Sequence, residues 1–413
     1  MLKSFVIDQP QTIRFGVGSR EGIPALLGRF GRKVLLFSGQ SWFRNSGWQA
    51  AFERLLADFE VRYLRCPGGE PESGKVSGLL EEARGFAPDV LLAVGGGSVL
   101  DTAKAVSGLA PLADPVEDFL EGVGRGLQIP RPGIPWIAVP TTAGTGAEVT
   151  KNAVLKAPAV EAKKSLRSPF ILASAVVVDP ELSRHCPLQL TGIAGMDALT
   201  QLIESFVSKK SAPVPRAWAR DAFPVMLAAL LRLPRDPEDL AARSGAAYGA
   251  LASGFALANG GLGAAHGFAS GLGGVYDIPH GLLCALFIRP VLRANARVIE
   301  GDVGLLRQAV GERAELFEPL GGVAGGAAPG GSGKARPTDS EKGSADWLLD
   351  MIDPLYDQYG LPRDLRDYAV DPSRVAELAR RSSGSSMSGN PRELDQGERE
   401  RIIRSLLPSG SPP

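Results

Sequence analysis

The chain is poor in the features that mark secreted or membrane-embedded proteins. Its 413 residues include three cysteines, Cys66, Cys186 and Cys284, with no paired spacing and an odd count. Disulfide scaffolds use even numbers of cysteines, so this usage indicates a reducing compartment, and we expect a cytoplasmic protein. The N-terminus has no sustained apolar core, and no later run is long and charge-free enough to span a bilayer.

An excess of either charge is also missing. Lys plus Arg and Asp plus Glu number 45 each, so no global field favours nucleic acid or an anionic membrane. We therefore expect neither as a partner. The length suggests two domains, or one large one, with enough chain to bury a core.

The first half of the sequence alternates short apolar runs with helical stretches. We predict strands at 11–15, 33–38, 60–64, 88–94 and 135–139, with helices at 21–30 and 48–58 between the first of them. Apolar runs such as Lys33-Val-Leu-Leu-Phe-Ser are typical of parallel strands that are buried on both faces. Strands and helices alternating at this spacing predict an α/β domain with a largely parallel sheet.

A glycine-rich loop follows the predicted strand at 88–94 and leads into a helix. Glycines without Cβ let backbone N–H groups approach a phosphate, and the helix N-terminus adds partial positive charge. A serine there can donate its hydroxyl, and we place the following aspartate in the first helical turn, where it favours the helix dipole. The residues assigned to the cofactor here are Gly95, Gly96, Gly97, Ser98 and Asp101. A tight turn without a ligand is the alternative, because the loop matches neither G-x-G-x-x-G nor a Walker A loop.

A second polar loop follows the strand at 135–139. It reads Pro140-Thr-Thr-Ala-Gly-Thr-Gly-Ala-Glu-Val-Thr, and the hydroxyls of Thr141, Thr142 and Thr145 stand among its glycines. Open α/β sheets bind ligands at the carboxyl ends of their strands. Two such loops on adjacent strands predict a dinucleotide site.

The second half reads as helical from residue 188 onward, and four side chains in it suggest a metal site. His266 and His280 are two of only three histidines in the chain, and each is followed by glycine. Asp197 and Gln201 are four residues apart and share one face of a helix. Imidazole and carboxylate together suit iron(II) or zinc(II), whereas the alternative for each histidine is a core residue bonded to backbone.

Together these motifs resemble the iron-containing, group III alcohol dehydrogenase family. The matching segments, in family order, are Gly95-Gly-Gly-Ser-x-x-Asp101, Pro140-Thr-Thr-Ala-Gly-Thr-Gly, Val178-Asp-Pro-Glu-Leu, Gly195-Met-Asp-Ala-Leu-Thr, His266-x13-His280-Gly and Asn390-Pro-Arg. The resemblance implies a dehydroquinate synthase-like architecture, with an α/β dinucleotide-binding domain over 1–187 and an all-helical metal and substrate domain over 188–413. It also implies a homo-oligomeric enzyme, a dimer, that transfers hydride between NAD(P) and a small alcohol or aldehyde.

The resemblance assigns the metal to Asp197, His266 and His280, with Gln201 where the family has a further histidine. A neutral amide oxygen is a weaker ligand than imidazole for late transition metals. Gln201 therefore leaves the choice among iron, zinc, manganese and no metal open, and iron is the metal that the resemblance implies. Ser270 stands where many members have another histidine, so a proton relay through imidazole is not expected.

The resemblance also extends the cofactor site. Many NAD-using members carry an acid after the second strand, where it holds the ribose 2′-hydroxyl. In this chain Gly39 stands at that position. An acid there would repel the 2′-phosphate of NADP and glycine does not, so we expect the site to accept NADP and even to prefer it. Lys164 corresponds to a lysine on the nicotinamide side, and Thr150 closes the second loop.

Three other functions remain open. A metal-free NAD(P)H reductase would leave Gln201 without a ligand role. A dehydroquinate synthase-like lyase would need a cluster of Lys and Arg near the ligand positions, which the helical half does not show. A non-catalytic nucleotide-binding protein is the third. Separately, the Gly- and Ser-rich stretch 321–346 is expected to be a flexible loop or a disordered insertion.

Overall fold

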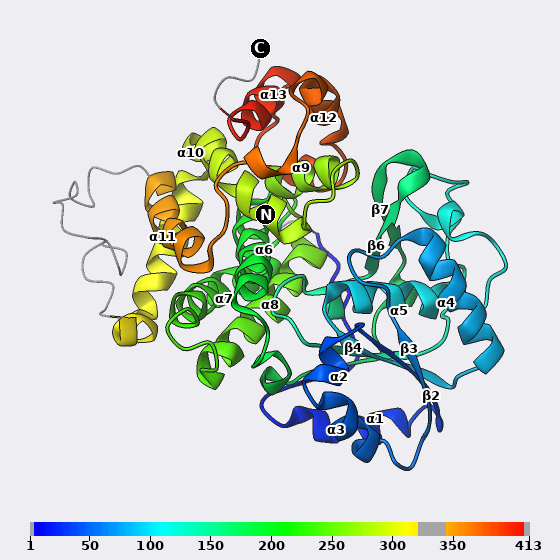
Figure 1. Ribbon diagram of the computed structural model, residues 1–413. Coiled ribbons are helices and arrows are strands. Elements are labelled where there is room, and N and C mark those ends of the chain that lie inside the picture. The colour runs from blue at the N-terminus through cyan, green and yellow to red at the C-terminus, as the bar shows by residue number, and fades with distance from the viewer. Residues whose placement is uncertain (1–3, 321–343, 409–413) are drawn as a thin grey trace. The chain divides into compact units, whose positions relative to one another are not determined.

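The computed structural model describes residues 4–320 and 344–408 and divides them into two compact units. The first unit is Ile7–Cys186, and the second comprises the described residues from Pro187 onward together with those before Ile7. Figure 1 shows strands only in the first unit and helices throughout the second.

The first unit is built on a parallel sheet of six strands in the order β1-β8-β5-β4-β2-β3. Every neighbouring pair in it is parallel. The strands are β1 (Ile13–Phe15), β2 (Lys33–Ser38), β3 (Glu60–Arg65), β4 (Val90–Gly95), β5 (Trp136–Pro140) and β8 (Ala175–Val178). All residues of β4 and β5 are buried, because helices cover both faces of a parallel sheet.

Five helices and a hairpin complete the first unit. The helices are α1 (Ile23–Leu27), α2 (Trp42–Asn45), α3 (Trp48–Leu55), α4 (Ser73–Phe86) and α5 (Gly97–Leu109). Strands β6 (Asn152–Ala157) and β7 (Ala162–Arg167) form a separate antiparallel pair. The five predicted strands and the parallel α/β class are confirmed, whereas β6, β7 and β8 were not predicted.

The second unit is helical, as predicted. Its helices are α6 (Leu188–Val207), α7 (Pro213–Arg232), α8 (Leu240–Gly260), α9 (Ala264–Gly273), α10 (His280–Glu312), α11 (Ser344–Tyr359), α12 (Val375–Arg381) and α13 (Gln396–Arg404). In the described part of this unit there is no β-strand. The expected loop at 321–346 lies outside the described residues except at its end, where α11 begins.

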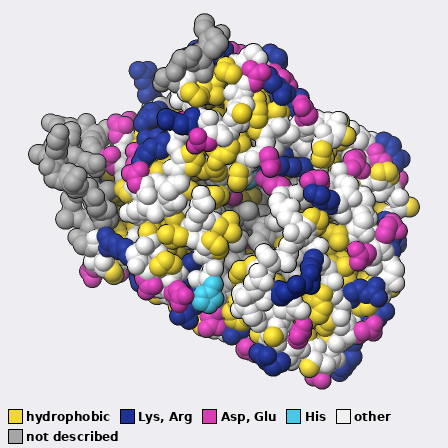
Figure 2. All heavy atoms as spheres, in the orientation of Figure 1, with side chains coloured by type: hydrophobic (Ala, Val, Ile, Leu, Met, Phe, Trp, Pro, Cys, Tyr) yellow, Lys and Arg dark blue, Asp and Glu magenta, His cyan; other side chains and the backbone are white. Residues whose placement is uncertain are grey.

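The surface agrees with the balanced composition. Basic and acidic side chains are intermingled on the face drawn in Figure 2. Within residues 4–320 and 344–408, no helix combines the length and apolar character needed to cross a bilayer.

Candidate active site

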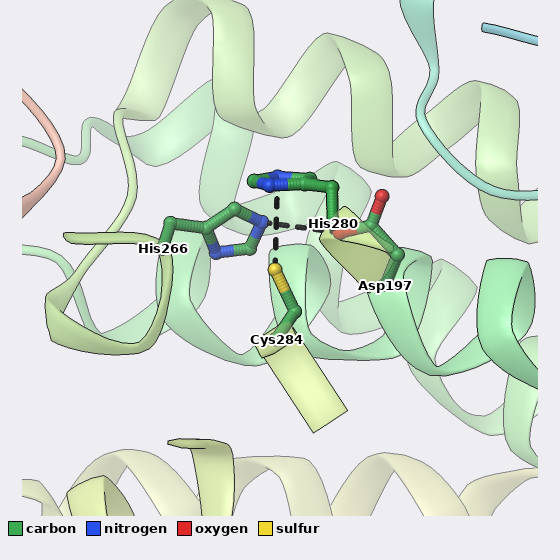
Figure 3. A group of neighbouring side chains, drawn as sticks. All are labelled: Asp197, His266, His280 and Cys284. Carbon is green, nitrogen blue, oxygen red and sulfur yellow. Dashed lines mark hydrogen bonds and ion pairs between the residues drawn. The ribbon is translucent and has the colours of Figure 1, made fainter. Parts of the chain in front are cut away.

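Four side chains from three helices of the second unit meet at one point (Figure 3). Asp197 comes from α6, His266 from α9, and His280 and Cys284 from α10. One ligand atom from each lies within 4.8 Å of all the others. The structure thus brings together three of the four residues assigned to the metal and adds a cysteine that was not predicted.

The start of α10 sets this arrangement. The helix begins at His280, and Cys284 lies one turn later on the same face, with its Sγ 3.7 Å from Nε2 of His280. Gly281 makes this position possible, because a Cβ there would lie 2.5 Å from the carbonyl oxygen of Ile193 and 3.1 Å from Cβ of Asp197. The absence of a side chain therefore lets α10 begin directly against α6.

The cluster is buried and electrostatically incomplete. Asp197 and His266 are 2% and 3% exposed, and Oδ1 of the first lies 3.3 Å from Nε2 of the second. Neither atom has a hydrogen-bond partner among the described residues. A buried polar atom without a partner costs free energy. Because the carboxylate oxygen and the imidazole nitrogen both carry lone pairs, this pair of atoms is suited to bind a cation.

The charges of the cluster shift one another's pKa values. Burial would raise the pKa of Asp197, but His266 and His280 lower it to about 2. Burial would lower the pKa of His266, but Cys284, Asp197 and Glu204 raise it well above its ordinary value. Burial raises the pKa of the Cys284 thiol to about 12. These shifts indicate that the cluster favours a positive charge.

Glu204 orients the imidazole of His266. Its Oε2 lies 2.7 Å from Nδ1 of that ring, and its carboxylate also accepts the backbone N–H groups of Gly263 and Ala265 at 3.0 and 2.7 Å. An acid on one ring nitrogen fixes the other nitrogen toward a metal and raises its basicity. The sequence contains a signal for this role, since Asp197 and Glu204 are seven residues apart on one helix face.

Gln201 is engaged elsewhere. It is 3% exposed, and its Oε1 accepts a hydrogen bond from the hydroxyl of Ser253, on α8, at 2.7 Å. Ser270, on α9, is partly buried. The cysteine that joins the cluster also had a sequence signal, because Cys284 follows His280 by four residues at a predicted helix entry.

The donor set fits a divalent cation. It offers one carboxylate, two imidazoles and one sulfur, which suit zinc(II) and iron(II) better than the oxygen-seeking magnesium or calcium. Two of its groups carry negative charge when deprotonated, which matches the charge of such an ion. The buried atoms of Asp197 and His266 without hydrogen-bond partners are where that ion would bind.

The two predicted cofactor loops lie side by side in the first unit. β4 and β5 are neighbours, and the backbone N–H of Thr141 donates to the carbonyl oxygen of Gly95 at 3.0 Å. A Cβ at Gly96 would lie 3.2 Å from Oγ1 of Thr142, and one at Gly97 would lie 2.7 Å from Oγ1 of Thr145. The glycines therefore let the loops touch. No side chain caps the N-terminus of α5, whose N–H groups can serve an anion.

The placement of Asp101 was wrong in one respect. Helix α5 begins at Gly97, so Asp101 lies beyond its first turn and has little influence on the helix dipole. Its Oδ2 accepts the backbone N–H of Val154 at 3.0 Å, and its Oδ1 lies 3.2 Å from Nζ of Lys104. It thus joins α5 to β6.

Three further cofactor residues have different surroundings. Thr150 is 4% exposed, and its hydroxyl oxygen accepts a hydrogen bond from Nζ of Lys104 at 2.9 Å. Lys164 is exposed on β7, whereas its neighbour Lys163 pairs with Glu70. Gly39 follows β2 with open space around it, since an added Cβ would meet nothing within 4 Å.

Known proteins resemble the chain over both units. Residues 10–180 match the family described as iron-containing alcohol dehydrogenase, and residues 191–407 match the C-terminal family of Fe-containing alcohol dehydrogenases. A choline dehydrogenase of Bacillus subtilis (strain 168) is 31% identical over 74% of this chain and 70% of its own. An NADPH-dependent butanol dehydrogenase of Clostridium saccharobutylicum is 27% identical over 95% and 96%. The crystal structure of a 1,3-propanediol oxidoreductase is 27% identical and covers 98% of this chain and 100% of its own, with a TM-score of 0.83.

Proposed function

The chain belongs to the iron-containing alcohol dehydrogenase family, and we propose that its NAD(P)-linked alcohol dehydrogenase reaction is centred on Asp197, His266 and His280. The reaction is a reversible hydride transfer between the nicotinamide and a small alcohol or carbonyl compound. The observation that carries this site assignment is the buried cluster of metal-type donors, in which Asp197 and His266 have atoms without hydrogen-bond partners.

The protein's part is to hold charge and geometry at this cluster. A divalent metal, when bound, supplies Lewis-acid stabilisation of the negative charge that develops on the substrate oxygen. Asp197 contributes the balancing negative charge, and Glu204 keeps Nε2 of His266 directed toward it. Helices hold all of these groups, which gives the site the rigidity that electrostatic catalysis needs.

We assign nucleotide binding to the first unit and metal and substrate binding to the second, which corresponds to domains 1–187 and 188–413. The nucleotide, when bound, carries the hydride. The N–H groups at residues 95–98 and the hydroxyls of Thr141, Thr142 and Thr145 would hold its phosphates, and the exposed Lys164 would reach its nicotinamide side. Asp101 and Thr150 both contact Nζ of the buried Lys104, and in this way they would stabilise the two loops without binding the nucleotide themselves.

NADP is the nucleotide we propose as preferred, because Gly39 presents no acid against a 2′-phosphate. Relatives named for NADPH and for NAD both occur, so this choice rests on Gly39. We also propose a cytoplasmic homodimer. The three buried cysteine thiols suit a reducing compartment, and the dimer rests on the family resemblance.

The test combines metal analysis with an assay. Protein purified without oxygen is analysed for iron and zinc, and its reduction of butanal with NADPH or NADH is measured before and after chelation. We expect near-stoichiometric metal, loss of activity on chelation, and recovery when metal is restored. H266A should lose at least about 100-fold in kcat/KM, equivalent to about 2.7 kcal/mol.

The third histidine provides the matched control. His185 is exposed, lies in the other unit and is not part of the cluster, so H185A should keep both metal and activity. Tight NADPH binding combined with metal-free activity that ignores the chelator would instead favour the metal-free reductase and contradict the metal-centred proposal.

A further inference from the structure

Cys284 lies where a fourth metal ligand is needed. The family resemblance accounts for three residues of the cluster and places Gln201 in the remaining position. The amide oxygen of Gln201 already accepts the Ser253 hydroxyl, and its NH₂ group has no lone pair for a metal. The thiol of Cys284 is fully buried and lies within 4.8 Å of the other three ligand atoms.

Two of the distances between ligand atoms match the edges of a tetrahedral coordination sphere. For metal–ligand bonds of about 2.0–2.3 Å, the edges of a tetrahedron measure about 3.3–3.8 Å. Oδ1 of Asp197 and Nε2 of His266 are 3.3 Å apart, and Nε2 of His280 and Sγ of Cys284 are 3.7 Å apart. Both pairs therefore already have the separation of neighbouring ligands on one metal ion. Figure 3 shows the thiol directed at His280 on the inner side of the cluster.

We propose that Cys284 completes the metal site as a thiolate ligand, giving a centre of one carboxylate, two imidazoles and one thiolate. This inference rests on the proposed function, because it concerns the same metal. Binding forms a metal–sulfur bond, breaks the S–H bond and releases the proton to solvent. With Asp197, the thiolate balances the two positive charges of the ion.

A thiolate changes which metal the site prefers. Sulfur is a softer donor than the imidazole it replaces, and sites with thiolate and imidazole suit zinc. With four protein ligands in place, the substrate oxygen of the proposed reaction would have to bind as a fifth ligand. The cysteine therefore directs this chain toward zinc. A buried cysteine that acts only as a small apolar core residue is the competing explanation.

X-ray absorption of the zinc-loaded wild-type enzyme tests the ligand directly. We expect one sulfur neighbour at about 2.3 Å together with nitrogen and oxygen neighbours at about 2.0–2.2 Å. C284S should lose the sulfur shell and bind zinc at least about tenfold more weakly, whereas Q201A should keep the sulfur shell. The control C186S changes a buried thiol of the other unit and should keep both the sulfur shell and the affinity.

Two negative results are distinguishable. Stoichiometric zinc surrounded only by nitrogen and oxygen in the wild-type enzyme would overturn the role of Cys284 and leave the proposed function in place. Failure of the wild-type protein to bind zinc, iron(II) or cobalt(II) at all would overturn both. Because the first measurement needs no variant, it holds even if C284S does not fold.

Discussion

Gly39 is the residue at which nucleotide choice can be tested without disturbing the fold. Open space surrounds it, so a larger side chain is tolerated. In G39D, the new carboxylate would repel a 2′-phosphate and accept the 2′-hydroxyl of NAD(H). We expect the ratio of kcat/KM for NADPH over NADH to fall about tenfold or more, which corresponds to about 1.4 kcal/mol. G39A, with no charge, should keep the wild-type ratio; an equal fall in both variants would show that Gly39 does not face the ribose.

Glu148 provides a residue-scale prediction of pH dependence. It is 4% exposed, and burial raises its pKa from 4.5 to about 7, although Lys104 opposes the shift. The folded protein therefore holds this proton more tightly than the unfolded chain does, and the free energy of unfolding falls as the pH rises from about 4.5 to 7. E148Q removes this loss, so it should match the wild type at pH 4 and exceed it by up to about 3 kcal/mol at pH 8.

Urea unfolding at several pH values measures this difference. Lys104 and Asp101 are buried ionisable residues whose pKa values are also shifted by folding. They are present in both the wild type and E148Q, so the difference between the two proteins cancels their contribution to the pH dependence of the free energy of unfolding. Parallel stability curves for wild type and E148Q would show that Glu148 is ionised in the folded protein throughout the range.

The site residues differ in how visible they are in the sequence. His266 and His280 could be predicted as metal ligands because histidine is rare in this chain and imidazole is a common metal ligand. The spacings of Glu204 from Asp197 and of Cys284 from His280 place each residue on the helix face of a predicted ligand, but they do not name its role. That role depends on burial, beside His266 of α9 for Glu204 and beside His280 within α10 for Cys284. A carboxylate seven residues from Asp197 becomes a partner of His266 only after α9 has packed against α6.

At the scale of elements, the predictable strands are those whose burial is uniform. β2 and β4 are continuous apolar runs, because helices cover both faces of the sheet. β6 and β7 both carry lysines. β6 buries every second residue and β7 buries only Leu166, so their pattern is weak in the sequence. β8 has four residues, too few to show a period. The hairpin of β6 and β7 forms because the two strands pair with each other, and hydrophobic periodicity along the sequence does not reveal such pairing.

The contact between α10 and α6 gives an element-scale prediction. In G281A the new methyl group would lie 2.5 Å from the carbonyl oxygen of Ile193, so the start of α10 must move away from α6 and take His280 and Cys284 with it. We expect at least about tenfold weaker zinc binding and a loss of stability of about 1–3 kcal/mol.

The same helix contains the matched control. A Cβ at Gly301, within α10, meets nothing within 4 Å. G301A should therefore leave zinc binding unchanged and raise stability by about 0.5–1 kcal/mol, because alanine loses less backbone entropy in a helix. Zinc titration and urea unfolding of both variants measure the contrast, and equal effects at the two positions would show that the contact at Gly281 does not shape the site.

At the scale of the whole molecule, the proposed binding sites are divided between the two compact units. The donor cluster lies wholly within the second unit, and the glycine and threonine loops lie wholly within the first. The order of motifs along the chain made this division predictable, because each motif lies within one structural class, the parallel sheet or the helices. Each unit folds its own binding residues into place, so each ligand should stabilise the unit that holds its site.

Hydrogen exchange measured with each ligand separately tests this division. A ligand at 100 times its Kd stabilises its unit by about 2.7 kcal/mol, so amides that exchange by opening that unit should slow up to about 100-fold. Zinc should protect α6, α9 and the start of α10, and NADPH should protect residues 95–98 and 141–146. H266A should abolish protection by zinc and keep protection by NADPH. If NADPH left both loops unprotected in the wild-type enzyme, the assignment of the nucleotide to the first unit would be wrong, because these loops hold every phosphate-binding group assigned to it.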